Sequence, residues 1–222
     1  MLAKPSPDQK VQLYVLETYK LENGAQPARL HEWLRESWLP AHDGPAIVLD
    51  ALVAPHMPQV AAIRGYASFE EWLSVREKTP YRSEQLFNDA AHVLLQRAGY
   101  SPDLIVEATA SPRIFELRLY HSPSWPQLEA LHERFAGPEI AIFHRLGIHP
   151  LLYTSTLAGP HVPNLVYLTP FADLAARERA WSAFMADPEW HQVRQESIER
   201  GGQISQNMQI SLYRAAAYSP IR

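Results

Sequence analysis

The 222-residue sequence contains no cysteine, which excludes disulfide bonds, thiolate nucleophiles and cysteine-bound metals. It also lacks an excess of basic residues: 20 lysines and arginines against 24 aspartates and glutamates give a formal net charge of −4. Binding to nucleic acid favours a basic surface, so we expect no nucleic-acid partner. No apolar run approaches the roughly 18 residues of a membrane span, and the first ten residues resemble no targeting signal. These absences predict a cytoplasmic protein with no membrane span.

Several catalytic motifs are also missing. The glycine-rich loops GxGxxG and GxxxxGK[ST] and the nucleophile motif GxSxG do not occur, which argues against nucleotide cofactors and serine-hydrolase chemistry. The histidines show neither HxH nor HExxH spacing. The sequence therefore predicts no metal and no cofactor.

What the chain does contain is an internal similarity. The string YVLETY at 14–19 resembles FELRLY at 115–120, and PHMPQ at 55–59 resembles PHVPN at 160–164. Because the two pairs are separated by 101 and 105 residues, we interpret the chain as two homologous halves, 1–110 and 111–222. The alternative is a chance similarity of two short strings.

The second half predicts the order βαββαβ. Phe115, Leu117 and Leu119 alternate with polar residues, as in a strand with one apolar face. A helix over 128–146 ends at Gly147, and a hairpin follows over 151–168. A helix capped by Asp173 restarts at Asp187 and precedes a last strand over 208–213. Trp181 and Trp190 are interpreted as core anchors of this helical segment. The order is that of the ferredoxin-like split βαβ unit.

The first half predicts the same order. Its expected strands cover 11–19, 46–53, 60–66 and 104–109. One helix carries Leu30, Trp33 and Trp38, a second begins at Ser68 with Glu71 completing a capping box, and a third covers 83–98. We therefore expect an α+β fold of two tandem ferredoxin-like modules. Helices should cover one face of each antiparallel sheet, and the other two faces should pack on each other.

The second half contains five strings in a characteristic order: FELRLY at 115–120, GIHP at 147–150, GPHVPNLVYL at 159–168, DPEW at 187–190 and YSP at 218–220. Together these strings resemble the NIPSNAP family. The resemblance implies the dimeric α+β barrel superfamily, further association into a homo-oligomer, and no agreed catalytic residues. Relatives in that superfamily include cofactor-independent monooxygenases, haem-degrading enzymes, isomerases and binding domains. The first half departs from the pattern, because Val15 and Glu17 stand where Glu116 and Arg118 stand in the second.

One polar strand face provides the main candidate site. Glu116, Arg118 and Tyr120 share a face of an otherwise apolar strand. Arg118 could bind an anionic substrate and Tyr120 could donate a hydrogen bond to it. The alternative is an internal ion pair between Glu116 and Arg118.

Histidines and tyrosines provide the other candidates. His149, after the helix stop, could transfer a proton, or it could hold the turn by binding a helix-end carbonyl. Tyr153 and Tyr167 could wall a pocket or simply pack in the core. His161 and His56 occupy matching hairpin positions and could meet as metal ligands, or they could be exposed turn residues, which we favour.

Two functions remain open from the sequence. The first is a cofactor-independent enzyme that acts on a small hydrophobic or aromatic compound in a pocket of the second half. In it, the catalytic residues would be His149, Arg118 and Tyr120, and the ligand-binding residues would be Glu116, Tyr153, His161 and Tyr167. The second is a non-catalytic module that binds a small ligand or another protein. The fold does not decide between them.

Overall fold

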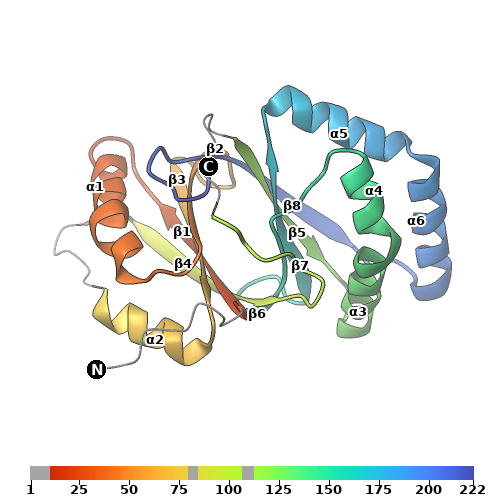
Figure 1. Cartoon of the computed structure of the whole chain (residues 1–222), viewed down its shortest axis with the longest axis horizontal. Coiled ribbons are helices and arrows are strands. Elements are labelled where there is room, and N and C mark those ends of the chain that lie inside the picture. The colour runs from red at the N-terminus through yellow and green to blue at the C-terminus, as the bar shows by residue number, and fades with distance from the viewer. Residues whose placement is uncertain (1–10, 80–84, 107–112) are drawn as a thin grey trace.

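The computed structural model describes residues 11–79, 85–106 and 113–222. A closed barrel of eight antiparallel strands lies at the centre, with one group of helices on each of two opposite sides (Figure 1). The strands are β1 (Leu13–Lys20), β2 (Ala46–Val53), β3 (Gln59–Tyr66), β4 (Asp89–Arg97), β5 (Ile114–His121), β6 (Leu152–Ala158), β7 (Asn164–Phe171) and β8 (Asn207–Ala215). The helices are α1 (Gln26–Trp33), α2 (Phe69–Lys78), α3 (Trp125–Arg134), α4 (Ile140–Arg145), α5 (Leu174–Ala186) and α6 (Pro188–Gly201).

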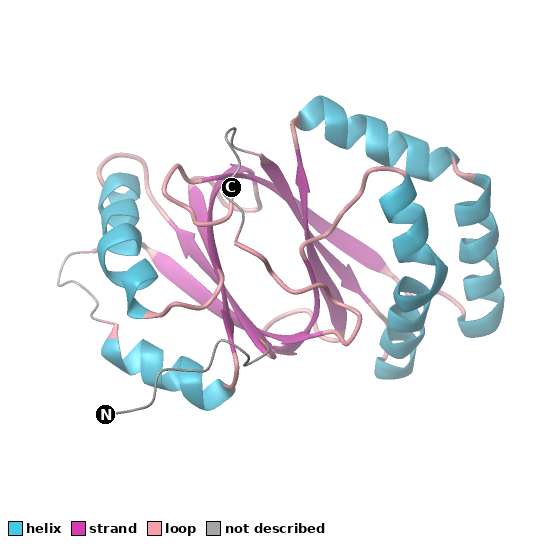
Figure 2. Cartoon of the chain, in the orientation of Figure 1, coloured by secondary structure: helices cyan, strands magenta, loops and turns pink. Residues whose placement is uncertain are grey.

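The strands follow the ring order β1-β3-β2-β8-β5-β7-β6-β4. Figure 2 shows the strands gathered at the centre, with helices on both sides. The first half therefore contributes the order β4-β1-β3-β2, and the second half contributes the equivalent order β8-β5-β7-β6. The two halves join where β2 pairs with β8 and where β4 pairs with β6. The predicted α+β class is confirmed, and the eight antiparallel strands close into one barrel.

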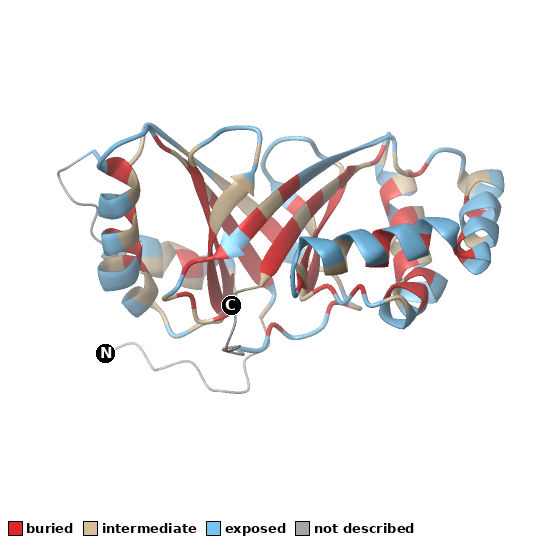
Figure 3. Ribbon diagram, turned by 90° about the horizontal axis from the view of Figure 1, so that it is seen from above, coloured by how far each residue is buried: buried red, intermediate tan, exposed pale blue. Residues whose placement is uncertain are grey.

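Apolar side chains fill the barrel. One buried cluster draws on all eight strands and includes Tyr14, Ile47, Phe115 and Tyr213. Figure 3 shows the buried residues concentrated on the strands, between two helix groups whose outer surfaces are exposed. Because successive strand residues point to opposite faces, the inward position of Phe115 places its neighbour Glu116 on the outer, helix-covered face.

The predicted caps and the predicted glycine stop are confirmed at the observed helix ends. The side chain of Ser68 accepts a hydrogen bond from the backbone N–H of Glu71, and the Asp173 and Asp187 side chains cap α5 and α6 in the same way. Gly147 follows α4 in the left-handed conformation, with φ of 81°. The helix expected over 128–146 is interrupted. Non-helical angles at Gly137 separate α3 from α4, and the π-helical turn η3 (Phe135–Glu139) connects them.

The first half contains one clear error of prediction. The described residues of the segment expected as a third helix, 85–98, contain no helix, and Asp89–Arg97 is strand β4. This strand is needed to close the barrel, since it pairs with β1 on one side and β6 on the other. A short apolar run has no decisive period, so tertiary pairing decided its structure. The strand expected over 104–109 is absent at 104–106, and 107–109 lie outside the described residues.

Two Tyr-Ser-Pro segments, 100–102 and 218–220, hold the halves together and are here called the clasps. Each follows the last strand of its own half and binds the second strand of the other half. Ser101 Oγ accepts from the Tyr153 N–H at 2.9 Å, and Ser219 Oγ accepts from the Val48 N–H at 2.9 Å.

Each clasp tyrosine also reaches a histidine of the other half. The Tyr100 hydroxyl lies 2.7 Å from His132 Nδ1, and the Tyr218 hydroxyl lies 2.7 Å from His31 Nδ1. Equivalent serine and tyrosine contacts therefore occur at both junctions of the barrel, β4 with β6 and β8 with β2.

Candidate functional site

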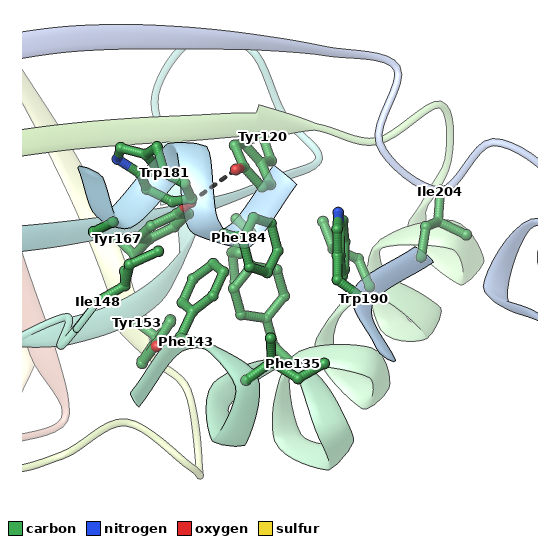
Figure 4. Packing of buried hydrophobic residues seen from close by; sticks show 14 of the residues in the cluster. Tyr120, Phe135, Phe143, Ile148, Tyr153, Tyr167, Trp181, Phe184, Trp190 and Ile204 are labelled. Carbon is green, nitrogen blue, oxygen red and sulfur yellow. Dashed lines mark hydrogen bonds between the residues drawn. The ribbon is translucent and has the colours of Figure 1, made fainter. Parts of the chain in front are cut away.

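A cavity of about 370 Å³ lies on the outer face of β5 and β8, beneath α5 and α6. This volume falls within the range of small-molecule sites. Its polar wall includes Arg118, Tyr120, Arg134 and Glu139. Its apolar lining consists of Trp181, Phe184, Met185, Trp190, Ile198, Ile204, Met208 and Ile210. Figure 4 shows several of these aromatic side chains packed together between the strands and the helices.

Strand register explains how these residues meet. Met208 of β8 pairs with Tyr120, and Ile210 pairs with Arg118. Paired residues in an antiparallel ladder point to the same face, so both apolar side chains flank the polar row of β5. Met208 is 51% exposed and Met185 is 61% exposed, whereas Tyr120 is 7% exposed. The cavity therefore has a buried polar wall and an apolar mouth.

The ion pair expected as the alternative role of Arg118 exists, but it does not use the whole guanidinium. Glu116 is fully buried and accepts from Nε of both Arg118 and Arg177. Arg118 Nη1 donates to the Tyr120 hydroxyl at 3.0 Å, and Nη2 has no hydrogen bond among the described residues. Both N–H groups of Nη2 therefore remain to bind a ligand.

The charge of Arg118 is secure. Burial acts to lower the pKa of Arg118, but the nearby oxygens of Tyr167, Tyr120 and Glu116 raise it above its usual value. The guanidinium also lies over the Trp181 ring, 3.5 Å from its centroid. A permanent, largely desolvated cation therefore faces the cavity, where water weakens its field less than at the surface.

Tyr120 is arranged as a hydrogen-bond donor. Its oxygen accepts from Arg118 and, at 2.8 Å, from the Tyr167 hydroxyl (Figure 4). Burial raises the pKa of Tyr167 well above its ordinary value, so Tyr167 stays neutral and keeps the proton it donates. The hydroxyl hydrogen of Tyr120 has no acceptor among the described residues and can be donated to a ligand.

Glu139 was not identified from the sequence. It ends the π-helical turn η3, is 1% exposed and belongs to the cavity wall. Arg134 Nε donates to Glu139 Oε2 at 2.7 Å. Burial raises the pKa of Glu139 despite the opposing effect of Arg134. The available signal was the Gly137-Pro138 pair within a helical pattern, since π-helical turns often occur at functional sites.

Residues 115–220, which include β5 to β8 and the whole cavity lining, match the family model of NIPSNAP. We refer to this stretch as the NIPSNAP domain, after the family model that it matches. No curated protein sequence matches the chain.

The chain also resembles solved structures, some of them over nearly its whole length. An anthrone oxidase-like protein is 15% identical, with a TM-score of 0.61, covering 95% of this chain and 92% of its own. A proposed monooxygenase from Lactobacillus acidophilus NCFM is 9% identical, with a TM-score of 0.56, covering 92% of this chain and 94% of its own. A NIPSNAP-like domain protein from Burkholderia xenovorans is 27% identical, with a TM-score of 0.42, covering 49% of this chain and 89% of its own. At these identities, the two full-length similarities show a shared fold.

His149 does not join the cavity of the NIPSNAP domain. It is exposed, and its ring stacks on His144 with 5.0 Å between centroids. His161 is also exposed, at the hairpin tip, where φ is 63° and its carbonyl accepts from Asn164. Neither histidine lines the cavity that contains Arg118 and Tyr120. The expected meeting of all three proposed catalytic residues therefore does not occur.

Tyr153 and Tyr167 are core residues of the NIPSNAP domain, and neither lines the cavity directly. Tyr153 is 1% exposed and packs on Tyr100, with ring centroids 5.4 Å apart. Tyr167 acts on the site through its hydrogen bond to Tyr120. Trp181 and Trp190 are buried as predicted, and both also line the cavity.

The first half carries a filled counterpart of this site. Glu17 of β1 occupies the place of Arg118 and accepts from Trp38 Nε1 at 3.0 Å. The Arg64 guanidinium covers the Trp38 ring at 3.7 Å. Only about 20 Å³ remains open among these side chains. Among the described residues no helix between α2 and β4 corresponds to α6, which supplies one wall of the larger cavity.

The described residues contain neither a cluster of metal ligands nor a membrane-spanning helix. No group of three or more histidine, aspartate or glutamate side chains in the described ranges could hold a metal ion. Across those same ranges, none of the helices combines the length and apolar character that crossing a bilayer requires.

Proposed function

We propose that the cavity of the NIPSNAP domain is the active site of a cofactor-independent enzyme for a small hydrophobic or aromatic compound. One observation carries this proposal: an apolar cavity of about 370 Å³ contains a buried, permanently charged Arg118 beside a tyrosine with an uncommitted hydroxyl hydrogen. Core packing alone does not require a guanidinium with unused N–H groups beside a tyrosine whose hydroxyl hydrogen has no acceptor.

In this function the apolar walls bind the body of the substrate. Arg118 Nη2 and the Tyr120 hydroxyl bind one of its oxygens and stabilise negative charge that develops there. Glu116 and Arg177 are positioning residues, because they hold the Arg118 side chain from behind through the shared carboxylate. The site is preorganised, since these contacts exist before a ligand binds.

The test compares small aromatic acids with their neutral amides, for example 2-naphthoate with 2-naphthamide. We expect the acids to raise the melting temperature of the wild-type protein more than the amides do, because only the acids pair with Arg118. Arg118→Met should abolish the preference, and Tyr120→Phe, which removes only the hydroxyl, should weaken it. Each compound that binds is then incubated with the protein in air, and mass spectrometry measures whether it is converted to a product.

Two results would overturn the proposal. One is equal stabilisation by acids and amides in the wild-type protein. The other is a preference for acids that survives Arg118→Met in a variant whose circular dichroism is unchanged.

The alternative function is non-catalytic binding of a small ligand or a protein. The exposed apolar side chains at the cavity mouth, Met185 and Met208 among them, favour it. Binding that depends on Arg118 without any chemical conversion across the panel would support this alternative.

We also propose that the chain consists of two tandem ferredoxin-like modules, 1–110 and 111–222. The repeated strand order and the two equivalent clasps support this division. A cytoplasmic location and association into a homo-oligomer remain predictions from the sequence.

A further inference from the structure

We infer that Glu139 is the general base of this cavity and that its substrate is a weak acid, such as a phenol or a compound with a C–H beside a carbonyl. This inference rests on the proposed function and names its substrate class. The step transfers one proton from the substrate to a Glu139 carboxylate oxygen. The electron pair of the broken O–H or C–H bond stays on the substrate as an oxyanion beside Arg118 and Tyr120.

The position of the carboxylate is the first support. Glu139 is 1% exposed, yet it belongs to the wall of the same cavity as Arg118 and Tyr120. Its Oε2 accepts from Arg134, whereas Oε1 has no hydrogen bond among the described residues. A general base needs a fixed side chain with one oxygen free to accept a proton. The bond from Arg134 fixes the Glu139 side chain through Oε2 and leaves Oε1 free.

The charges around Glu139 are the second support. Arg134 on α3, Arg118 on β5 and Arg194 on α6 line the cavity, and Glu139 is its only carboxylate among the lining residues. Burial raises the pKa of Tyr100, Tyr153 and Tyr167, and the nearby charge of Glu139 adds to the rise at each. When Glu139 takes up a proton, the three arginines remain to stabilise the substrate anion.

The environment also strengthens the base. Burial raises the pKa of Glu139, which increases the affinity of its carboxylate for a proton. A purely structural role would need only the bond to Arg134. Buried ion pairs contribute little net stability compared with apolar residues of similar volume. Stabilising one helix turn therefore does not by itself explain a buried carboxylate at this position.

The experiment uses 2-naphthol, a neutral phenol whose absorption changes when it ionises. We expect the wild-type protein to bind 2-naphthol as the naphtholate, with the apparent pKa of the bound phenol lowered by at least about one unit, a tenfold change in ionisation. Glu139→Gln keeps the size and an acceptor for Arg134 but cannot take up a proton. The wild-type protein should keep the phenol proton on Glu139 and release none on binding, whereas Glu139→Gln should either bind the neutral phenol or release one proton to the buffer for each naphtholate bound. Calorimetry in two buffers of different ionisation enthalpy counts the protons released, and Glu139→Asp should behave between the two.

The matched control is Glu133→Gln, an exposed glutamate of α3 that lies outside this cavity. It should behave as the wild-type protein. The assignment would be overturned if Glu139→Gln and Glu133→Gln showed both the same ionisation of bound 2-naphthol and the same proton release, or if bound 2-naphthol stayed neutral in the wild-type protein.

The same samples separate this inference from the proposed function. If 2-naphthoate binds through Arg118 but 2-naphthol is not ionised through Glu139, only the role of Glu139 fails. If neither compound binds in the cavity, the proposed function fails as well.

Discussion

Replacing each clasp serine by alanine tests how the two halves are held together. In Ser219→Ala the buried N–H of Val48 loses its acceptor, and in Ser101→Ala the buried N–H of Tyr153 does. Val48 is fully buried and Tyr153 is 1% exposed, so water cannot replace the lost oxygen at either position. A buried donor left without a partner costs about 1–3 kcal/mol, and we expect each variant to lose that much stability.

The two substitutions should differ in a defined way. Ser219 Oγ also donates to the Ile221 carbonyl at 2.7 Å, whereas Ser101 Oγ lies 3.3 Å from the Pro102 carbonyl. Ser219→Ala should therefore fall at the upper end of the range. The clasps act at different barrel junctions, so the double variant should lose the sum of the two effects, within about 0.5 kcal/mol.

The assay is urea unfolding followed by tryptophan fluorescence. With a slope of about 2 kcal/mol/M, the unfolding midpoint should fall by about 0.5–1.5 M for each variant while the slope stays unchanged. Ser182→Ala is the control, because that exposed serine of α5 bonds only to the Glu178 side chain. A midpoint shift in either clasp variant no larger than that of the control would refute the reasoning.

Three further predictions concern single residues. His149→Ala should leave the melting-temperature shift by 2-naphthoate unchanged, because His149 is exposed outside the cavity, and a lost shift would contradict the site. Asp187→Asn should lower the urea midpoint near neutral pH and less so in acid. Arg145 and the Trp190 N–H depress the pKa of Asp187, and that stabilisation disappears as pH falls through the folded-state pKa. His132→Gln should lower the midpoint more at about pH 8 than at about pH 5. Burial depresses the pKa of His132, so the wild-type protein loses stability as pH falls below the unfolded-state value, and a constant difference would contradict this.

Signals that act over a few residues could be read from the sequence. The alternation in β5 correctly placed Glu116, Arg118 and Tyr120 on one face, and the caps at Ser68 and Asp173 marked helix starts. These features depend on strand pleating and on hydrogen bonds between near neighbours, so the amino-acid order alone determines them.

The segment around β4 shows the opposite case. Its residues contain no strong local preference, and Asp89–Arg97 became a strand because β1 and β6 supply partners on both sides. The same limit applies to His149, whose exposure depends on where α4 ends relative to the rest of the domain. Propensity is weak wherever distant partners compete for a segment.

The sequence by itself determined the strand and helix signals of the NIPSNAP domain, the polar row of β5 and the repeated Tyr-Ser-Pro strings. Only the tertiary structure decided that these strings bind the opposite half and that Glu139 lies in the same wall as Arg118. It also decided that α6 covers a cavity whose counterpart, among the described residues of the first half, is nearly filled. The physical reason is how far apart in the sequence the interacting residues lie. A cap or a pleat involves residues a few positions apart, whereas a cavity forms where side chains from β5, α3, α6 and β8 meet, which no local pattern specifies.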